Sequence, residues 1–300
     1  MKHRRLGATG LSVSVVGLGT WQYGGEWGRE FSQNEVDEIV DAARQAEITL
    51  IDTAECYGDH LSERLVGKSI RGDRDNWVVA TKFGHGYKGR FERGERWSPA
   101  EVERQLEDSL RALATDRIDL YQFHSGANSV FDSEELWTML RRQVEAGKVR
   151  ALGISVSSAP ETHLHQAGRA RALGAGAMQV VYNRLKQDAE KELFPLCRRE
   201  DLGVIARVPL ASGFLGGRYR GEVHFDPTDI RSRRSPQDLK ETLAMVETIR
   251  AKEVPPGVPM SLWALAWCLS HPAVTCVIPG AKSAQQVRLN AAAADLSWRR

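Results

Sequence analysis

The stretch Thr49-Leu50-Ile51-Asp52-Thr53-Ala54-Glu55-Cys56-Tyr57-Gly58 gives the first indication of the fold. A short apolar run ends on an acid, and a tyrosine follows in the polar segment after it. This pattern predicts a buried strand that enters a loop, with Asp52 at the carboxyl end of the strand and Tyr57 just above it. A carboxylate and a phenol so close together are chemically useful if a cation lies between them. We therefore expect a cation from a neighbouring strand end.

Strands alternate with helices along the whole chain. Apolar runs predict strands at residues 13–18, 50–52, 77–80, 118–123, 149–154, 178–181, 203–206 and 275–278. Helical periodicity marks residues 34–46, 62–70, 134–146, 161–172, 189–199, 236–252, 260–270 and 283–294, and Ser98-Pro99-Ala100-Glu101 is a capping box that begins another helix. Eight such cycles predict a closed parallel barrel. We expect one α/β domain over residues 1–300: a (β/α)8 TIM barrel with an N-terminal β-hairpin and extra helices in the C-terminal half.

Composition narrows the class of protein. The 300 residues are 42% hydrophobic, which suffices for one large core, and 41 basic against 39 acidic residues argue against a nucleic-acid-binding surface. No signal-peptide pattern or membrane-length apolar run is present. The cysteines Cys56, Cys197, Cys268 and Cys276 lack metal-type spacing, so we expect no metal and a reducing, cytoplasmic setting.

Polar residues follow three neighbouring predicted strands. Asp52 with Tyr57, Lys82 and His124 stand at the carboxyl ends, where barrel enzymes place their active groups. We expect Lys82 to lower the pKa of the Tyr57 phenol from about 10, and Asp52 to keep Lys82 charged. The result would be a proton donor and acceptor. The alternative is a structural ion pair beside an unrelated histidine and a loop tyrosine.

A family resemblance rests on four motifs in order. The chain resembles the aldo-keto reductases along nearly its whole length through Gly17-Leu18-Gly19-Thr20-Trp21, residues 52–58, Thr81-Lys82-Phe83 and Val277-Ile278-Pro279-Gly280. The resemblance implies a catalytic tetrad of Asp52, Tyr57, Lys82 and His124. It also implies that NADPH delivers hydride to the carbonyl carbon of an aldehyde or ketone while Tyr57 donates the proton and His124 orients the carbonyl.

The resemblance further implies a cofactor site. Its members are Gly19, Thr20, Trp21, Asp52, Ser155, Gln179, Arg207, Pro209, Leu210, Gly213, Leu215, Gly217, Arg218, Gly280, Lys282, Ser283, Gln286 and Asn290, with Asn183 as a further candidate. Gly213 and its neighbours would cover the pyrophosphate, and Lys282 with Ser283 suits a 2′-phosphate, so NADPH is expected over NADH.

Two positions depart from the family pattern. Val156 stands where an asparagine is usual, and Arg207 stands where a tyrosine commonly stacks on the nicotinamide. A guanidinium plane can also stack. Its charge would disfavour the cationic oxidised ring, which predicts preference for the reduced cofactor.

Substrate specificity is expected from loops. The candidate walls are Trp21, Tyr23, Tyr57, Phe83, Tyr87 and His124, with Trp27 and Phe214 as further aromatics. The short tail after the last helix, ending at Trp298-Arg299-Arg300, predicts an open site. Cys56 is expected to be exposed enough to make activity sensitive to thiol reagents.

Several readings stay open. Gly84-His85-Gly86-Tyr87-Lys88-Gly89 spells G-x-G-x-x-G, but a charged loop rather than a helix is expected after it, so a Rossmann turn is not predicted. His163 and His165 lack further ligands at metal-site spacing. The same barrel could serve as a cofactor-binding sensor or regulatory subunit, as in potassium-channel β-subunits, or as a lyase that uses Lys82 as a Schiff-base amine. The substrate partner is expected to be a small carbonyl compound; the oligomeric state is not predicted.

Overall fold

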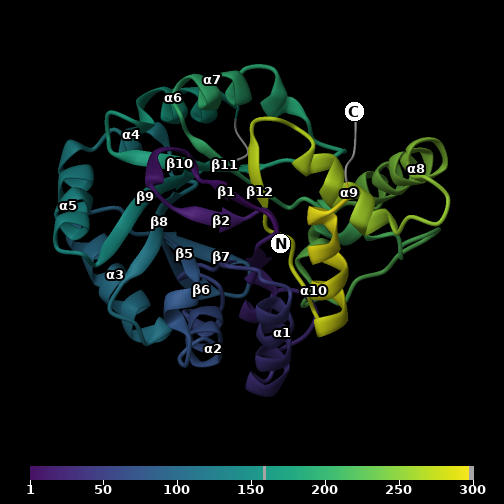
Figure 1. The fold of residues 1–300 in the computed structure, drawn as a ribbon, viewed down its shortest axis with the longest axis horizontal. Coiled ribbons are helices and arrows are strands. Elements are labelled where there is room, and N and C mark those ends of the chain that lie inside the picture. The colour runs from purple at the N-terminus through teal and green to yellow at the C-terminus, as the bar shows by residue number, and fades with distance from the viewer. Residues whose placement is uncertain (158–159, 297–300) are drawn as a thin grey trace.

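Eight parallel strands form the central sheet of the computed structural model, which describes residues 1–157 and 160–296. In spatial order they are β3 (Leu18–Gly19), β4 (Leu50–Asp52), β5 (Val78–Phe83), β8 (Ile118–His124), β9 (Val149–Ser155), β10 (Ala175–Val181), β11 (Gly203–Arg207) and β12 (Val274–Val277). Parallel bridges from Val16 to Val277 and from Gly19 to Gly280 join the last strand to the first. The sheet therefore curls into a barrel, which Figure 1 shows end-on, and the predicted (β/α)8 fold is confirmed.

Helices surround the barrel and carry its outer layer (Figure 1). They are α1 (Gln33–Gln45), α2 (Leu61–Ser69), α3 (Pro99–Leu113), α5 (Glu134–Glu145), α6 (Pro160–Ala170), α7 (Leu193–Arg199), α8 (Pro236–Glu253), α9 (Met260–Leu269) and α10 (Ala284–Ala291), with the single turn α4 (Asn128–Phe131). Capping boxes at Ser32–Glu35 and Ser98–Glu101 begin α1 and α3, because each serine and glutamate satisfies a free backbone N–H of the first turn. Both α8 and α9 lie between β11 and β12, which confirms the extra helix in the C-terminal half.

The amino end of the barrel is closed by the N-terminal hairpin of β1 (His3–Arg5) and β2 (Ser12–Ser14). Leu6, Leu11 and Val13 pack against one inward-facing side chain from each of seven barrel strands: Leu50, Ala80, Leu120, Ala151, Ala177, Ile205 and Cys276. Gly7 lies so close to the strand ends that a Cβ would approach Gly203 N to 2.0 Å. This floor leaves the carboxyl end of the barrel for the site.

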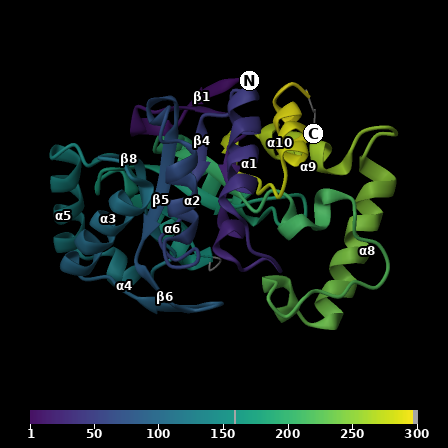
Figure 2. The same ribbon diagram turned by 90° about the horizontal axis from the view of Figure 1, so that it is seen from below.

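Two predicted segments differ from the structure. The run at 13–18 is not one strand: Val13 belongs to the hairpin, Leu18 begins β3, and residues between them connect the floor to the barrel wall. Residues 90–97 were expected as a charged loop, but part of them forms β7 (Glu92–Glu95), which pairs with β6 (His85–Gly89) in a second hairpin. Its glycines and charges concealed the strands. Figure 2 shows β1 and β6 at opposite ends of the molecule.

Smaller boundary errors have local causes. Helix α7 begins at Leu193 rather than 189 because Pro195 then lies in its first turn, where a missing N–H breaks no helical hydrogen bond. The tail at 298–300 lies outside the described residues. Within the part of the chain that the structure describes, no helix is both long and apolar enough to cross a bilayer.

Candidate active site

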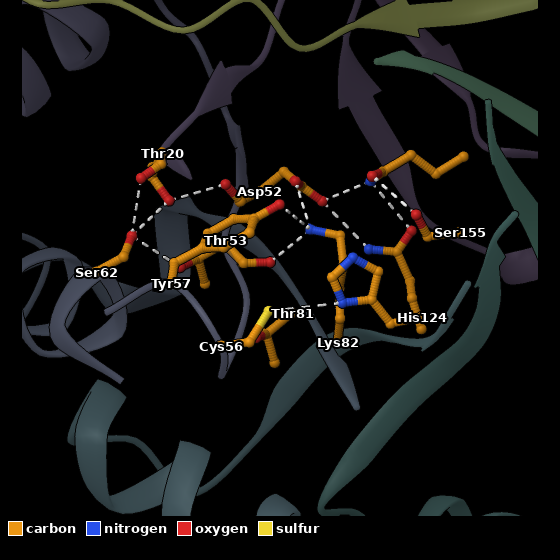
Figure 3. Close-up of polar contacts among 12 residues, drawn as sticks. Thr20, Asp52, Thr53, Cys56, Tyr57, Ser62, Thr81, Lys82, His124 and Ser155 are labelled. Carbon is orange, nitrogen blue, oxygen red and sulfur yellow. Dashed lines mark hydrogen bonds and ion pairs between the residues drawn. The ribbon is translucent and has the colours of Figure 1, made fainter. Parts of the chain in front are cut away.

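Asp52, Tyr57 and Lys82 meet at the carboxyl ends of β4 and β5 (Figure 3). Lys82 Nζ donates to Asp52 Oδ1 at 2.7 Å and to the Thr53 carbonyl oxygen at 2.7 Å, and it lies 3.4 Å from Tyr57 Oη. The Lys82 and Asp52 side chains are 1% and 5% exposed. The cation expected between the carboxylate and the phenol is therefore Lys82.

Burial controls the protonation of this group. It disfavours the charged ammonium, but the Asp52 carboxylate raises the pKa of Lys82 above its ordinary value, so the amine stays charged. Burial also raises the pKa of the Tyr57 phenol, and the opposing effect of Lys82 is smaller. The expected lowering of the pKa of Tyr57 is therefore wrong for this structure, because desolvation of the phenolate exceeds its attraction to Lys82. Tyr57 is a protonated donor at neutral pH.

His124 ends β8 and lies beside Tyr57, with ring centroids 6.5 Å apart. Burial and the nearby Lys82 ammonium lower the pKa of His124 well below its ordinary value. The imidazole is therefore neutral and can hydrogen-bond a carbonyl oxygen without a full charge of its own.

Gln122 is a member of the site that sequence reasoning missed. Its Nε2 donates to Asp52 Oδ2 at 3.2 Å, and its Oε1 accepts from Gln179 Nε2 at 3.2 Å. Gln179 Nε2 also donates to Asp52 Oδ2 at 2.6 Å, while Ser155 Oγ donates to Gln179 Oε1 at 3.3 Å. The inward direction of Gln122 on β8, two residues before His124, was the available signal.

A cavity of about 520 Å³ opens above this cluster. Most of the predicted cofactor residues line it: Gly19, Thr20, Trp21, Asp52, Gln179, Arg207, Pro209, Leu210, Gly213, Arg218, Gly280, Lys282, Gln286 and Asn290. Tyr57, His124 and Trp27 also line the cavity. Residues from distant strand ends and loops thus share one binding space.

Some predicted residues lie elsewhere. Tyr23 and Phe83 are fully buried in the hydrophobic core, as are Leu215 and Phe214. Tyr87 is off the cavity wall, on the β6–β7 hairpin, with the Arg93 guanidinium 5.5 Å from its ring centroid. Gly217 is the left-handed end of a 3-10 helix, and Ser283 caps α10 by accepting from Gln286 N. Ser155 reaches the site only through Gln179.

The two departures from the family pattern are linked to each other. Arg207 Nη2 donates to the carbonyl oxygen of Val156 at 3.1 Å, while Arg207 Nε has no hydrogen-bond partner among the described residues. Burial lowers the pKa of the Arg207 guanidinium, and Tyr57 and Asp52 act against that shift. The backbone carbonyl oxygen of Val156 makes this hydrogen bond, so the contact with Arg207 does not depend on the side chain at position 156.

Loop contacts narrow the mouth of the cavity. Buried Glu26 accepts from Trp21 Nε1 at 2.5 Å, from Phe91 N at 3.3 Å and from Arg93 Nη2, and so ties the β6–β7 hairpin to the barrel. Lys282 Nζ donates to the Trp27 carbonyl oxygen at 2.9 Å. No sequence pattern marked Glu26, because its partners Phe91 and Arg93 are remote in the chain.

A second tie holds the loop that follows β11. Arg231 pairs with Asp229 at 2.6 Å and donates to the Ser212 carbonyl oxygen and to Tyr219 Oη. Asp229 forms a bridge with Trp27. The loop is therefore fixed beside the residues expected to cover a pyrophosphate.

Cys56 lines the cavity wall but is buried, with only 3% of its surface exposed. Burial raises the pKa of its thiol. The expectation of an exposed, reagent-sensitive thiol is wrong, because a protonated buried thiol reacts slowly.

The G-x-G-x-x-G run lies in the β6–β7 hairpin and opens no helix. His165 pairs with Asp132 at 2.8 Å.

A barrel with a buried Asp–Lys pair, a tyrosine and a neutral histidine at its carboxyl end is a barrel enzyme with acid–base groups in one cavity. A family model, the aldo/keto reductase family, matches residues 15–298. The chain belongs to the aldo/keto reductase family and is an oxidoreductase by that membership.

Relatives and solved structures agree with this family. Aldo-keto reductase YhdN of Bacillus subtilis is 31% identical over 298 residues, covering 96% of this chain and 87% of the relative. The uncharacterized oxidoreductase Rv2298 of Mycobacterium tuberculosis is 34% identical over 290 residues, covering 95% and 85%. The glycerol dehydrogenase AKR11B4 of Gluconobacter oxydans superposes with a TM-score of 0.84 at 27% identity, covering 99% and 91%. The aldo-keto reductase AKR11C1 of Bacillus halodurans, solved in its holo form, gives 0.82 at 29%, covering 99% and 92%.

Proposed function

We propose that the protein reduces the carbonyl group of an aldehyde or ketone with NADPH, and that Tyr57 donates the proton. The observation that carries the proposal is the Asp52–Lys82–Tyr57 cluster under a cavity that His124 also lines. The nicotinamide supplies the hydride when it is bound. Tyr57 is protonated at neutral pH, which suits the reductive direction, in which the carbonyl oxygen gains a proton.

The remaining groups prepare that proton transfer. Lys82 keeps its charge beside the phenol and stabilises the phenolate left after donation. Neutral His124 can donate a hydrogen bond to the carbonyl oxygen, and the buried amides of Gln122 and Gln179 hold Asp52 in place. Gln179 also lines the cavity, where its amide is suited to a nicotinamide carboxamide.

The lining also supports the choice of cofactor. Lys282 and Arg218 supply positive charge to the cavity wall, as a 2′-phosphate requires, and Gln286 and Asn290 are suited to the adenosine. A solved neighbour named glycerol dehydrogenase makes small polyols and their carbonyl products a sensible part of a substrate panel. Four free, buried thiols support the reducing cytoplasmic setting proposed for the protein.

The first experiment is a titration with NADPH and with NADH, followed by tryptophan fluorescence, because Trp21 and Trp27 line the cavity. We expect tight quenching by NADPH and weaker quenching by NADH. A carbonyl panel then compares the native protein with Tyr57→Phe, which should bind NADPH normally but lose about 10²–10⁴-fold in kcat.

The outcomes separate the classes of function. Binding of NADPH without turnover of any carbonyl would support the sensor or regulatory subunit. No response to either nucleotide would contradict the reductase proposal at its base. Borohydride trapping of Lys82 with a carbonyl compound would support the lyase, which the charged Lys82–Asp52 pair disfavours.

A further inference from the structure

Three side chains with metal-binding atoms gather beside His124. The ligand atoms of Glu55, Cys56 and His124 all lie within 4.8 Å of one another. Cys56 Sγ is 3.9 Å from His124 Nδ1, and Glu55 Oε1 is 4.0 Å from the same nitrogen. The contact between Cys56 and His124 is drawn as a dashed line in Figure 3. Bond lengths of about 2.0 Å to nitrogen and 2.3 Å to sulfur put the ligands of a tetrahedral zinc ion roughly 3.5 Å apart. The two distances to His124 Nδ1 would have to shorten by about half an ångström, and the distance between the Glu55 and Cys56 ligand atoms by up to roughly 1.3 Å, to complete the geometry.

Glu55 has an unused oxygen in this cluster. The residue is 2% exposed; Oε1 accepts from His85 N at 3.1 Å, but Oε2 has no hydrogen-bond partner among the described residues. The neighbouring His85 Nδ1 is likewise buried without a described partner. A buried polar atom left unpaired costs about 1–3 kcal/mol. The carbonyl chemistry assigned to Tyr57 and His124 does not use this carboxylate, so its function is unexplained by the reductase site.

The chemistry of the three side chains favours one kind of metal ion, and the cavity gives that ion a way in. Carboxylate, thiolate and imidazole together are ligands of zinc rather than of magnesium or calcium, which prefer oxygen alone. Cys56, His85 and His124 line the cavity, so an ion can enter by its mouth. The cations Lys82, Arg93 and Arg207 lie near the cluster and oppose a divalent ion. Glu55 and the thiolate of Cys56 offset that charge, and the thiol proton leaves to solvent on binding.

We propose that Glu55, Cys56 and His124 bind one Zn²⁺ ion, with water in the fourth position, and that this ion inhibits the enzyme reversibly. Coordination through Nδ1 would draw the imidazole toward Cys56 and Glu55 and away from the position in which it orients the carbonyl, and the ion with its water would take up space in the cavity. The inhibition rests on the proposed reductase function, but the metal site itself does not.

The site is tested first without any activity measurement. The metal-free full-length protein is titrated with Co²⁺, whose bond to a thiolate gives a charge-transfer absorption. We expect this band in the native protein, its loss in Cys56→Ser, and about tenfold weaker binding in Glu55→Gln, which keeps the acceptor for His85 N. The matched control Cys197→Ala removes a thiol buried in α7 and should retain the band.

Inhibition is measured next by adding free Zn²⁺ to the protein and a carbonyl substrate. The rate of each variant with zinc is compared with the rate of the same variant without metal. The inhibition constant should rise about tenfold or more in Cys56→Ser and Glu55→Gln, and a chelator should restore the native rate. If Cys56→Ser does not fold, Glu55→Gln carries the comparison. No cobalt band in the native protein, or unchanged zinc inhibition in both variants, would overturn the site. A cobalt band in a protein without reductase activity would instead overturn only the proposed function.

Discussion

Asp52 is the residue to which the polar groups of the site connect. It binds Lys82 through one oxygen and the amides of Gln122 and Gln179 through the other. Sequence position identified Asp52, Tyr57, Lys82 and His124, because strand ends are recognisable from apolar runs. Gln122 was missed because the prediction used strand ends alone, although its spacing of two residues from His124 puts both side chains on one face of β8. The raised pKa of Tyr57 was missed because burial cannot be read from a loop position.

The pH dependence of reduction follows from that pKa. Burial raises the pKa of Tyr57 above about 10, and the proton donor must be protonated to act. The rate of reduction at saturating substrate and cofactor should therefore stay level through neutral pH and fall only above about pH 10. A pH–rate profile with substrates of several reactivities measures this. An alkaline limb near pH 7–8 would contradict it and would indicate that Lys82 dominates over burial.

Gln122→Leu should lower kcat about tenfold while leaving the Kd for NADPH within a factor of a few. The change removes a donor to Asp52 and leaves Gln179 without one acceptor, so Asp52 and Lys82 become less well placed. Steady-state kinetics and NADPH titration measure the two effects. Gln143→Leu is the matched control, because that buried glutamine on α5 contacts Glu103 away from the cavity. Equal losses in both variants would show a merely structural role for Gln122.

Arg207 should make the protein prefer the reduced cofactor. A buried guanidinium held by Val156 places positive charge in the cavity, where the oxidised nicotinamide would carry positive charge as well. We expect NADP⁺ to bind at least about tenfold more weakly than NADPH, and Arg207→Met to reduce that ratio. Fluorescence and calorimetric titrations measure both Kd values. Comparable Kd values in the native protein would contradict the role assigned to the charge.

At the scale of elements, the predictable features were those with local causes. Capping boxes marked the starts of α1 and α3, and the apolar strands marked the barrel. The β6–β7 hairpin was missed because its stability comes from remote contacts, chiefly Glu26, rather than from an alternating pattern. The Arg231–Asp229 ion pair likewise had no local sequence pattern that would have predicted it.

Glu26→Gln should loosen the β6–β7 hairpin. Arg93 then loses its carboxylate partner, while Trp21 keeps an acceptor. We expect faster hydrogen exchange over residues 85–95 and a higher KM for the carbonyl, with a nearly unchanged Kd for NADPH. Glu92→Gln is the control, because Glu92 is an exposed residue of β7. Unchanged exchange in Glu26→Gln would show that the hairpin is held by other contacts.

At the scale of the whole molecule, the preferred cofactor should stabilise the folded protein more than the other cofactor does. A ligand at 100 times its Kd adds about 2.7 kcal/mol to the free energy of unfolding. NADPH should therefore raise Tm by several degrees more than NADH at equal concentration. Lys282→Ala should reduce the difference, because the charge that suits a 2′-phosphate is lost, whereas exposed Lys68→Ala should not. Equal shifts by both cofactors in the native protein would contradict the preference for NADPH.

The barrel as a whole was the most predictable property, because eight strand–helix repeats leave few alternatives. The contacts that close the barrel and seal its floor were less predictable. The bridges from Val16 to Val277 and from Gly19 to Gly280 join residues from the two ends of the chain, and Gly7 packs under Gly203, which is also remote in sequence. Such contacts depend on barrel closure itself and have no local pattern.

The packed floor at Gly7 also affects the order in which molecules can bind in the cavity. With Leu6, Leu11 and Val13 filling the amino end, we expect molecules to enter and leave through the mouth that Trp21 and Trp27 line. On the proposed function, a carbonyl compound bound above Tyr57 would block a nicotinamide from reaching Gln179. We therefore expect the cofactor to bind before the carbonyl compound and to leave after its product, so that the steady-state kinetics follow a compulsory order.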